Sequence, residues 1–94
     1  MHTRKGIEVR GELTNGGDAL IRILTDAERF GLAVLSVDVK SDGQRGRLHM
    51  SAAFASPCQP VDTALLAARL ERHSGVLAVQ CSEITFAGPE EMAA

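Results

Sequence analysis

The sequence predicts an α+β sandwich in which one four-stranded antiparallel sheet carries two helices on a single face. A strand–helix–strand pattern runs from Ile7 to Val39, and a second, shorter copy follows from Arg47 to Glu83. Charged residues occupy alternate positions along the first three strands. One face of the sheet is therefore expected to meet solvent, and both helices are expected to cover the other face.

Composition limits the partners that the chain can have. Ninety-four residues make one domain with a modest core. A formal net charge of −2 and a pI near 5.9 argue against nucleic acid or an anionic membrane as a partner. The three phenylalanines, with no tryptophan or tyrosine, do not provide the stacking platforms of single-strand binders.

No apolar run approaches the ~18 residues that would span a bilayer. The first residues, Met1–Lys5, lack the apolar stretch of a secretory signal. We therefore expect a cytoplasmic protein in which Cys58 and Cys81 stay reduced.

The first strand follows a polar lead-in, residues 1–6. Apolar and charged residues alternate along Ile7–Leu13, as in a half-buried strand. Gly11 falls on the inward face, which predicts close approach by the first helix.

A turn and a helix come next. The residues Asn15, Gly16 and Gly17 tolerate positive φ and predict a tight turn. Asp18 stands where an N-cap belongs, so its carboxylate is expected to accept N–H groups of the first helical turn. The helix is expected from Ala19 to Phe30. Its apolar residues recur at helical spacing: Leu20, Ile23, Leu24, Ala27 and Phe30.

A hairpin is expected after Gly31, which ends the helix in the left-handed region. The second strand starts near Ala33, with three apolar residues turned inward: Leu35, Val37 and Val39. A polar loop, Ser41–Gly46, connects it to a third strand, Arg47–Phe54.

The second helix is expected to open at Pro60 and to run to about Arg72 or His73. Four apolar residues predict its inward face: Val61, Ala64, Leu65 and Ala68. Leu66 and Leu70 widen that apolar surface, either for a partner or for packing against the first helix, and we favour packing.

A turn at Gly75 leads to the last strand, Val76–Glu83, and residues 84–94 are expected to be a tail on the surface. The order is βαββαβ. Right-handed crossovers then place the first and third strands in the middle, which gives the ferredoxin-like sandwich. The domain is predicted to span residues 7–83.

Catalytic and metal-binding patterns are weak. The histidines His2, His49 and His73 lie far apart and show no metal-ligand spacing. Cys58 precedes a helix, whose N-terminus can lower a thiol pKa. No histidine adjoins it and Pro60 removes one N–H donor, so we do not expect a reactive thiol there.

The remaining candidates for chemistry have simpler interpretations. Cys81 is expected to be a small buried hydrophobe. The strand carboxylates Glu8, Glu12 and Asp38 share their face with basic residues and are expected to form a solvated face.

The turn from Asn15 to Asp18 is the strongest candidate for a binding site. It has neither the spacing nor the lysine of a P-loop, and it is not G-x-G-x-x-G. Its N–H groups, at a helix N-terminus, could bind a carboxylate. The alternative, which we favour from the residues alone, is that Asp18 already fills that position as a cap.

The chain resembles the ACT domain family, and within it the short, single-domain small regulatory subunits of acetolactate synthase (acetohydroxyacid synthase). The resemblance covers residues 7–83. It rests on three stretches in order: Asn15–Val39, Ala55–Leu70 and Gly75–Val79.

The resemblance implies a regulatory subunit with no catalytic residues or cofactor of its own. Such subunits form homodimers, often side by side with an eight-stranded sheet. They bind and activate a catalytic subunit, to which thiamine diphosphate would belong. Many also bind a branched-chain amino acid, usually valine, at the dimer interface.

The family's effector site can be placed on this sequence, where it is altered. Its positions correspond to Asn15, Gly16, Gly17, Asp18, Ala19, Ala33 and Val34. Asp18 stands where feedback-sensitive members carry glycine, and its side chain would crowd and repel the amino-acid carboxylate. Ala33 replaces a polar asparagine, whereas Val34 keeps the apolar contact. We therefore expect weak or absent valine binding.

Two other functions remain open. The chain could be a free-standing ACT-like sensor of a small molecule, such as an amino acid, that regulates another enzyme. A small ferredoxin-like enzyme or metal carrier would need a nucleophile with a base or a C-x-x-C pair, which the sequence does not contain.

Overall fold

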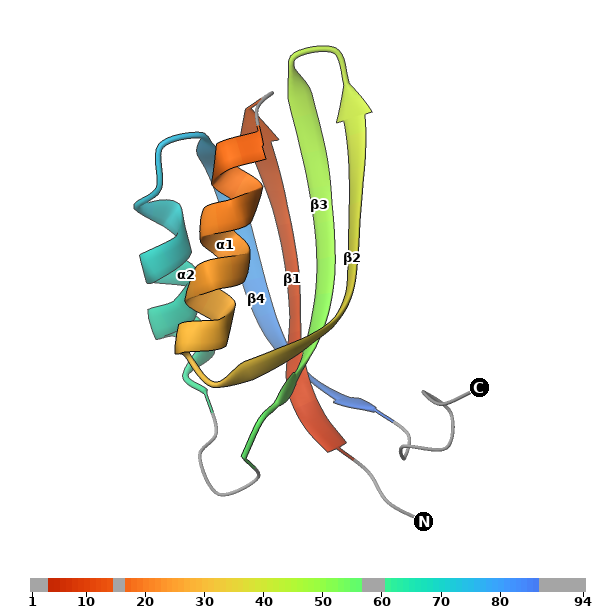
Figure 1. Ribbon diagram of the computed structural model, residues 1–94, viewed down its shortest axis with the longest axis vertical. Helices are drawn as coiled ribbons and strands as arrows, with labels where there is room; N and C mark the ends of the chain where they lie inside the picture. The colour runs from red at the N-terminus through yellow and green to blue at the C-terminus, as the bar shows by residue number, and fades with distance from the viewer. Residues whose placement is uncertain (1–3, 15–16, 57–60, 87–94) are drawn as a thin grey trace.

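The computed structural model describes residues 4–14, 17–56 and 61–86 of the chain (Figure 1). In chain order the elements are β1 (Arg4–Thr14), α1 (Gly17–Arg29), β2 (Leu32–Asp42), β3 (Arg45–Phe54), α2 (Thr63–Glu71) and β4 (Val76–Phe86). The βαββαβ order agrees with the sequence prediction.

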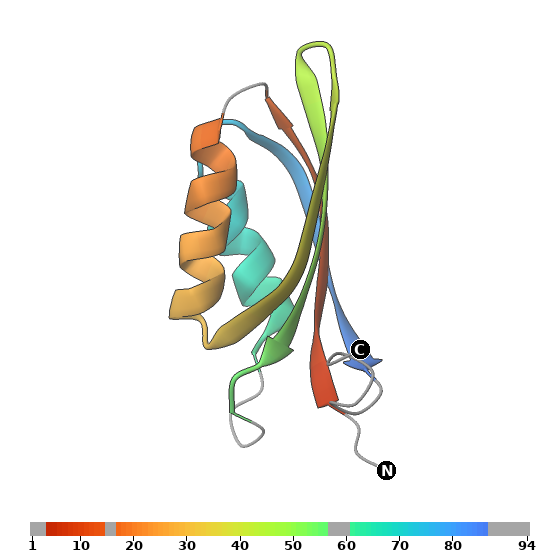
Figure 2. The same ribbon diagram turned by 45° about the vertical axis from the view of Figure 1, so that its right-hand side comes forward.

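The four strands form one antiparallel sheet in the order β2-β3-β1-β4. The first and third strands are therefore central, as predicted, and both helices lie on one face of the sheet (Figure 2). The strands extend beyond the predicted limits, because β1 begins at Arg4 and β4 continues to Phe86. The first three residues of the expected irregular tail, 84–86, therefore belong to β4. They pair with residues 4–6, which were predicted to be a lead-in.

The core lies between the sheet and the helices. It combines the inward residues of β1 and β3 with one face of each helix. Its largest fully buried side chains are Ile7, Val9, Ile23, Met50, Leu66 and Leu70. Burying an aliphatic side chain of this size contributes roughly 1.5–3 kcal/mol, so this layer holds the helices on the sheet.

Helix α1 begins two residues earlier than the expected start at Ala19. It starts at Gly17, so Asp18 lies inside the first turn and is not the cap residue. A carboxylate there still interacts favourably with the positive end of the helix dipole. At the other end Gly31 has φ of 85°, the predicted left-handed conformation.

Helix α2 begins at Thr63, not at Pro60, which lies outside the described residues. Asp62 is its N-cap, and the carboxylate accepts the N–H groups of Ala64 at 2.9 Å and Leu65 at 3.2 Å. The cap explains the later start. The Asp62 side chain accepts hydrogen bonds from N–H groups of the first turn, whereas a proline only lacks one N–H group and offers no acceptor.

The predicted inward face of α2 was right only at Val61, which is buried just before the helix begins. Leu66 and Leu70 are fully buried, whereas Leu65 is 57% exposed. Ala64 and Ala68 are exposed as well. Leucines and alanines occur on every side of this short helix, so its apolar pattern did not show which side faces the core. The two leucines at i and i+4 face the sheet, which confirms packing as their role.

The β2–β3 hairpin is tighter than the six-residue loop predicted from Ser41–Gly46. Its turn contains only Gly43 and Gln44, with Gly43 at φ of 67°. The strands consequently run further, and the hairpin projects past the helical layer (Figure 1). The register of β2 on β3 shifts between Val34 and Ser36, where a β-bulge interrupts the ladder.

Gly11 is crowded by a neighbouring strand and not, as predicted, by the first helix. A Cβ on Gly11 would lie 2.8 Å from the carbonyl oxygen of Ala78 on β4. On the opposite, outer face of the sheet, a Cβ on Gly6 would overlap the carbonyl oxygen of Ala52 on β3 and lie 2.6 Å from the Phe86 ring on β4. The absent side chains therefore let β3 and β4 lie close against β1.

A polar contact links the ends of the two helices. Asp26 on α1 is only 7% exposed, and its Oδ2 lies 2.5 Å from Nε2 of His73, just after α2. Burying a carboxylate is costly unless a partner satisfies it. The pair therefore fixes where α2 ends relative to α1.

The Asp26–His73 contact gives a prediction about stability. Asp26→Ala and His73→Ala should each lower the free energy of unfolding by about 1–3 kcal/mol, since each leaves a part-buried polar group without its partner. The double variant should lose less than the sum. Urea unfolding of the four proteins, with the exposed Glu28→Ala as a control, measures the coupling. Additive losses would contradict it.

Candidate functional site

The structure separates the two halves of the predicted effector site within one chain. Asn15 and Gly16 lie outside the described residues. Gly17 opens α1, Asp18 is exposed beside it, and Ala19 is buried in the core at 3% exposure. Of the residues that the structure describes in this half of the site, Asp18 presents its carboxylate to solvent.

The other half lies at the far end of α1, where β2 begins (Figure 1). Ala33 pairs with Ala53 and Val34 with Ala52, so their side chains lie on opposite faces of the sheet. Val34 lies on the helix side, with the core residue Ala52. A helix of 13 residues is about 20 Å long, so one chain alone does not bring Asp18 and Val34 together.

The helices leave part of their own side of the sheet uncovered. On β2, Val37 and Val39 lie on the helix side, opposite the buried residues Met50 and Leu48. They were predicted to be buried, yet they are 39% and 41% exposed, and Leu35 at the bulge is 40% exposed. Helix α1 packs against the start of β2, but the helices do not cover the hairpin half of this strand (Figure 1).

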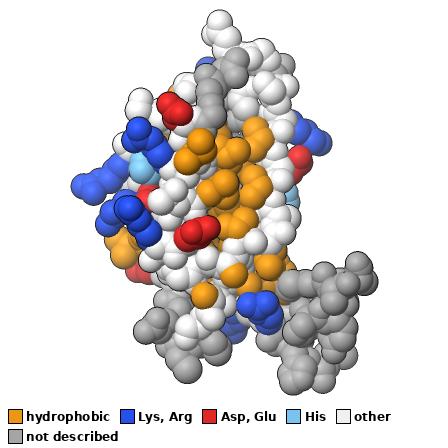
Figure 3. Space-filling view, viewed as in Figure 1, with side chains coloured by type: hydrophobic (Ala, Val, Ile, Leu, Met, Phe, Trp, Pro, Cys, Tyr) orange, Lys and Arg blue, Asp and Glu red, His pale blue; other side chains and the backbone are white. Residues whose placement is uncertain are grey.

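Together these residues form an exposed apolar surface, which we call the β2 apolar strip. It consists of Val37 and Val39, which share this face of β2 with the partly buried Val34. The partly buried Leu20 and Leu24 of α1 pack against the core that this face adjoins. Hydrophobic side chains gather on this side of the molecule next to the helices (Figure 3). Contiguous apolar patches of this kind commonly mark interaction sites.

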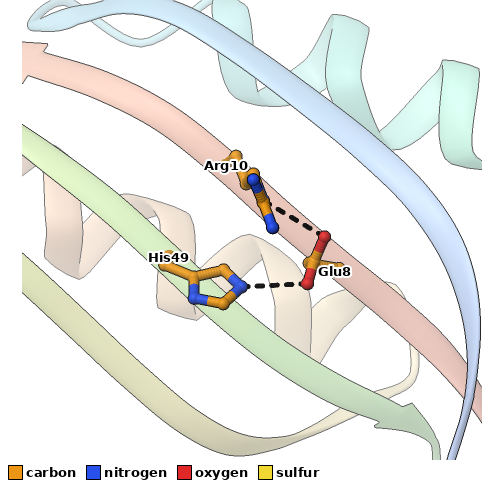
Figure 4. A network of polar contacts seen from close by, with 3 residues as sticks. All are labelled: Glu8, Arg10 and His49. Atoms are coloured by element: carbon orange, nitrogen blue, oxygen red, sulfur yellow. Dashed lines mark hydrogen bonds and ion pairs between the residues drawn. The ribbon is translucent and has the colours of Figure 1, made fainter.

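The outer face of the sheet carries a polar network (Figure 4). Glu8 Oε2 lies 3.0 Å from Nε2 of His49. Glu8 Oε1 accepts a hydrogen bond from the Nε–H of Arg10 at 3.2 Å. The hydrogen bond with His49, helped by the Arg10 charge, holds the pKa of Glu8 below its ordinary value. A carboxylate held ionised in this way is poorly suited to act as a general acid.

Next to this network the outer face has an open hollow of about 550 Å³. Its charged rim mixes both signs: Arg10, Lys40, Arg47, Glu12 and Asp38. Arg45 also pairs with Glu12 at 3.8 Å. All of these side chains are exposed, which agrees with the predicted solvated face.

Cys81 lies partly buried on β4, as the sequence suggested. Burial, followed by the charge of Glu71, raises the pKa of its thiol to about 11. The thiolate is the reactive form, so this cysteine is unsuited to nucleophilic chemistry near neutral pH. Cys58 lies outside the described residues.

Within residues 4–14, 17–56 and 61–86, no group of three or more histidine, cysteine or acidic side chains could hold a metal ion. Over the same ranges no helix has the length and apolarity needed to cross a membrane.

Sequence reasoning missed two side-chain contacts of the histidines. His49 and Glu8 are 41 residues apart, and His73 and Asp26 are 47 apart. The first pair follows from sheet register, because His49 lies opposite Arg10, next to Glu8 on that face. The second depends on how α2 ends against α1, for which the sequence has no local signal.

The sequence matches no protein-family model and no curated protein. Its fold, however, is shared with solved structures. The ACT domain of GTP pyrophosphokinase from Chlorobium tepidum has a TM-score of 0.62 at 10% identity, over 86% of this chain and all of that one. The C-terminal domain of the MgtC protein from Mycobacterium tuberculosis reaches 0.64 at 15% identity, over 92% of this chain and 94% of that one.

A further structure with this fold is LarC2, the C-terminal domain of a cyclometallase involved in synthesis of the NPN cofactor of lactate racemase. Its TM-score is 0.55 at 10% identity, over 92% of this chain and 58% of that one. The TM-scores establish a shared fold, which is that of the ACT domain. Identities this low establish nothing beyond the fold.

The outer-face network gives a prediction about titration. In the wild type, the carboxyl of Glu8 should titrate below its ordinary pKa of 4.5, and His49→Ala should raise that pKa because it removes the largest cause. Arg10→Gln should raise it less. Carboxyl carbon chemical shifts followed by NMR measure both changes.

The lowered pKa has a defined sign for stability. The folded state binds the Glu8 proton less tightly than the unfolded state does. The stabilisation that Glu8 contributes is therefore present above pH 4.5, and it disappears as the pH falls through the pKa of Glu8 in the folded protein. A Glu8 titration that is the same in the wild type and in His49→Ala would contradict the assignment.

Proposed function

We propose that this chain is a non-catalytic regulatory small subunit that binds and activates an acetolactate synthase catalytic subunit in branched-chain amino-acid biosynthesis. The observation that carries the proposal is the ACT fold over nearly the whole described chain. The acetolactate synthase part rests on the sequence resemblance of Asn15–Val39, Ala55–Leu70 and Gly75–Val79.

The chemistry of the described residues supports a role without catalysis. The Cys81 thiol has a raised pKa, and the Glu8 carboxyl is paired and exposed to solvent. Neither forms the nucleophile–base arrangement that covalent or acid–base catalysis needs. Thiamine diphosphate would be bound by the catalytic partner in the cytoplasm.

A homodimer is part of the proposal. The edge strand β2 has the β2 apolar strip along its helix side, where Val37 and Val39 are more than a third exposed. An open strand edge is a template for another strand. Pairing with a second copy would cover both the backbone edge and the strip.

Valine feedback is proposed to be weak or absent. A ligand carboxylate at the start of α1 would meet the exposed Asp18 carboxylate, which already interacts with the helix dipole. Ala33 offers no polar side chain, and it lies on the face of the sheet opposite Val34. The described residues therefore supply only an apolar contact.

The proposal predicts activation of a partner enzyme. Adding the purified chain to the acetolactate synthase catalytic subunit from the same cell should raise acetolactate formation several-fold, and the two should co-purify. A matched chain with Leu66→Asp, which places a charge in the core, should not activate because it should not fold.

The result also separates the rival function. If the chain neither binds nor activates that subunit, but binds an amino acid with micromolar affinity, it is a free-standing ACT-like sensor of another enzyme. If it does neither, both functions are excluded.

A second prediction concerns the altered effector site. Isothermal titration of the wild type with valine should give no binding at micromolar concentrations. Asp18→Gly, alone or with Ala33→Asn, should strengthen binding about tenfold or more because it removes a like charge and supplies an amide. Micromolar binding by the wild type would contradict the proposed loss of feedback.

A further inference from the structure

Four exposed arginines lie on the helical layer. Arg22 and Arg29 belong to α1, Arg69 is in the last turn of α2, and Arg72 is the C-cap residue of α2. None of the four forms an ion pair with a carboxylate among the described residues. Their charges are therefore available to another molecule.

Two contacts between the helices show which sides face each other. Asp26 of α1 contacts His73, which follows α2. The guanidinium carbon of Arg69 lies 6.0 Å from the centre of the Phe30 ring, which follows α1. Asp26 therefore marks the side of α1 that faces α2, and Arg69 marks the side of α2 that faces α1.

The other arginines lie on these same two sides. Residues three or four positions apart share one side of a helix. Arg22 precedes Asp26 by four positions, and Arg29 follows it by three. Arg72 follows Arg69 by three positions. The four arginines therefore border the line along which the helices meet, and basic side chains gather over the helices there (Figure 3). We call this group the arginine seam.

The exposed carboxylates of the helices lie mainly outside the seam. Glu28 follows Asp26 by two positions, which is about 200° around the helix axis. Glu71 follows Arg69 by the same interval, so both glutamates lie on the sides away from the seam. Asp18 is exposed one turn before the first arginine, at one end of the seam. Asp26 itself is buried at 7% exposure. Basic charge is thus concentrated along the seam.

An exposed apolar side chain adjoins the seam. Leu65 is 57% exposed and lies one turn before Arg69, on the same side of α2. The Phe30 ring attracts the Arg69 guanidinium, which restricts that side chain before any partner binds and lowers the entropy lost on binding. Arginine and aromatic residues are enriched in protein interfaces. The seam therefore has both the charge and the apolar contact of a protein-binding surface.

The spacing of the arginines fits an acidic protein segment better than a small anion. Arg22 and Arg29 are seven residues, or about 10 Å, apart along the axis of α1. They present a row of donors, whereas a small anion needs donors that converge in a concave site. Acidic side chains at i and i+7 of a partner helix have the same spacing. Each can accept two parallel hydrogen bonds from an arginine.

We propose that the arginine seam docks an acidic segment of the enzyme subunit that this chain regulates, with Leu65 against an apolar side chain of that segment. The identity of the partner rests on the proposed function, whereas the surface and its charge rest on the described residues. A net charge of −2 and a sequence without tryptophan or tyrosine disfavour nucleic acid as the ligand.

Titration of the full chain with poly-L-glutamate tests the surface without the enzyme subunit. Backbone amide shifts in NMR spectra should change most around Arg22, Arg69 and Arg72. The changes should diminish at high salt, because salt screens exposed charges. Changes that are largest around Arg10 and Arg47, on the outer face of the sheet, would overturn the proposal, as would no change at the seam. Single-stranded RNA that shifts the seam amides at a lower concentration than poly-L-glutamate would also overturn it.

Charge neutralisation tests docking of the enzyme subunit. Arg22→Gln/Arg72→Gln removes two exposed charges from the seam and keeps a similar helix propensity. Its affinity for the acetolactate synthase catalytic subunit should fall about tenfold or more in isothermal titration. The matched control Arg10→Gln/Arg47→Gln, on the outer face of the sheet, should stay within about threefold of the wild type. Leu65→Ala should weaken binding about threefold or more.

The outcomes separate the surface from the proposed function. If the wild type binds poly-L-glutamate at the seam but does not bind the catalytic subunit, the proposed function fails while the surface stands. If the wild type binds the catalytic subunit and both double variants bind it equally well, the seam is overturned and the proposed function stands. The double variants should unfold at the same urea concentration as the wild type. The poly-L-glutamate titration needs no variant, so it decides the question even if a substitution disturbs folding.

Discussion

The helical layer does not cover the sheet that it packs on. Two helices of 13 and 9 residues cover β1 and β4 and leave the helix side of β2 partly bare (Figures 1 and 2). The β2 apolar strip, the open backbone edge and the projecting hairpin all follow from this mismatch. The described residues do not cover the strip, so its full burial requires another chain or segment to pack against it.

The core limits how this mismatch can be resolved within one copy. Leu66 and Leu70 hold α2 on the sheet, and the Asp26–His73 contact fixes its end against α1. Moving either helix towards β2 would expose those leucines and separate a part-buried carboxylate from its partner. Both costs exceed what Val37 and Val39 would gain by becoming fully buried. The proposed self-association through β2 would avoid both costs.

Much of this fold could be predicted from the sequence. Strict alternation along Ile7–Leu13 identified a half-buried strand, and Gly31 identified the end of α1. The order of the strands followed from the handedness of the crossovers. These features depend on local periodicity and backbone conformation, which a single sequence shows directly.

Other features depended on interactions that the sequence does not display. The start of α2 was set by Asp62, whose capping competes with the proline signal at Pro60. The phase of α2 was ambiguous because apolar residues surround it. Exposure of Val37 and Val39 depends on the reach of the helical layer, a tertiary property.

The candidate site was predicted only in part. Asp18 proved to lie within the helix, so the proposed cap was wrong, while its exposed carboxylate remains the reason to expect weak valine binding. The distance between Asp18 and Val34 within one chain was not predictable from spacing alone. Under the proposed function, an effector site of this type would therefore need a second copy.

The central proposal is that two copies of the chain assemble through the edge strand β2. Amide hydrogen exchange as a function of protein concentration tests it most directly. Amides in Ser36–Asp42 that point away from β3 should become protected as concentration rises, while those on the free edge of β4 should not. Exchange in Ser36–Asp42 that stays fast at every concentration, or protection gained on β4 instead, would contradict the account.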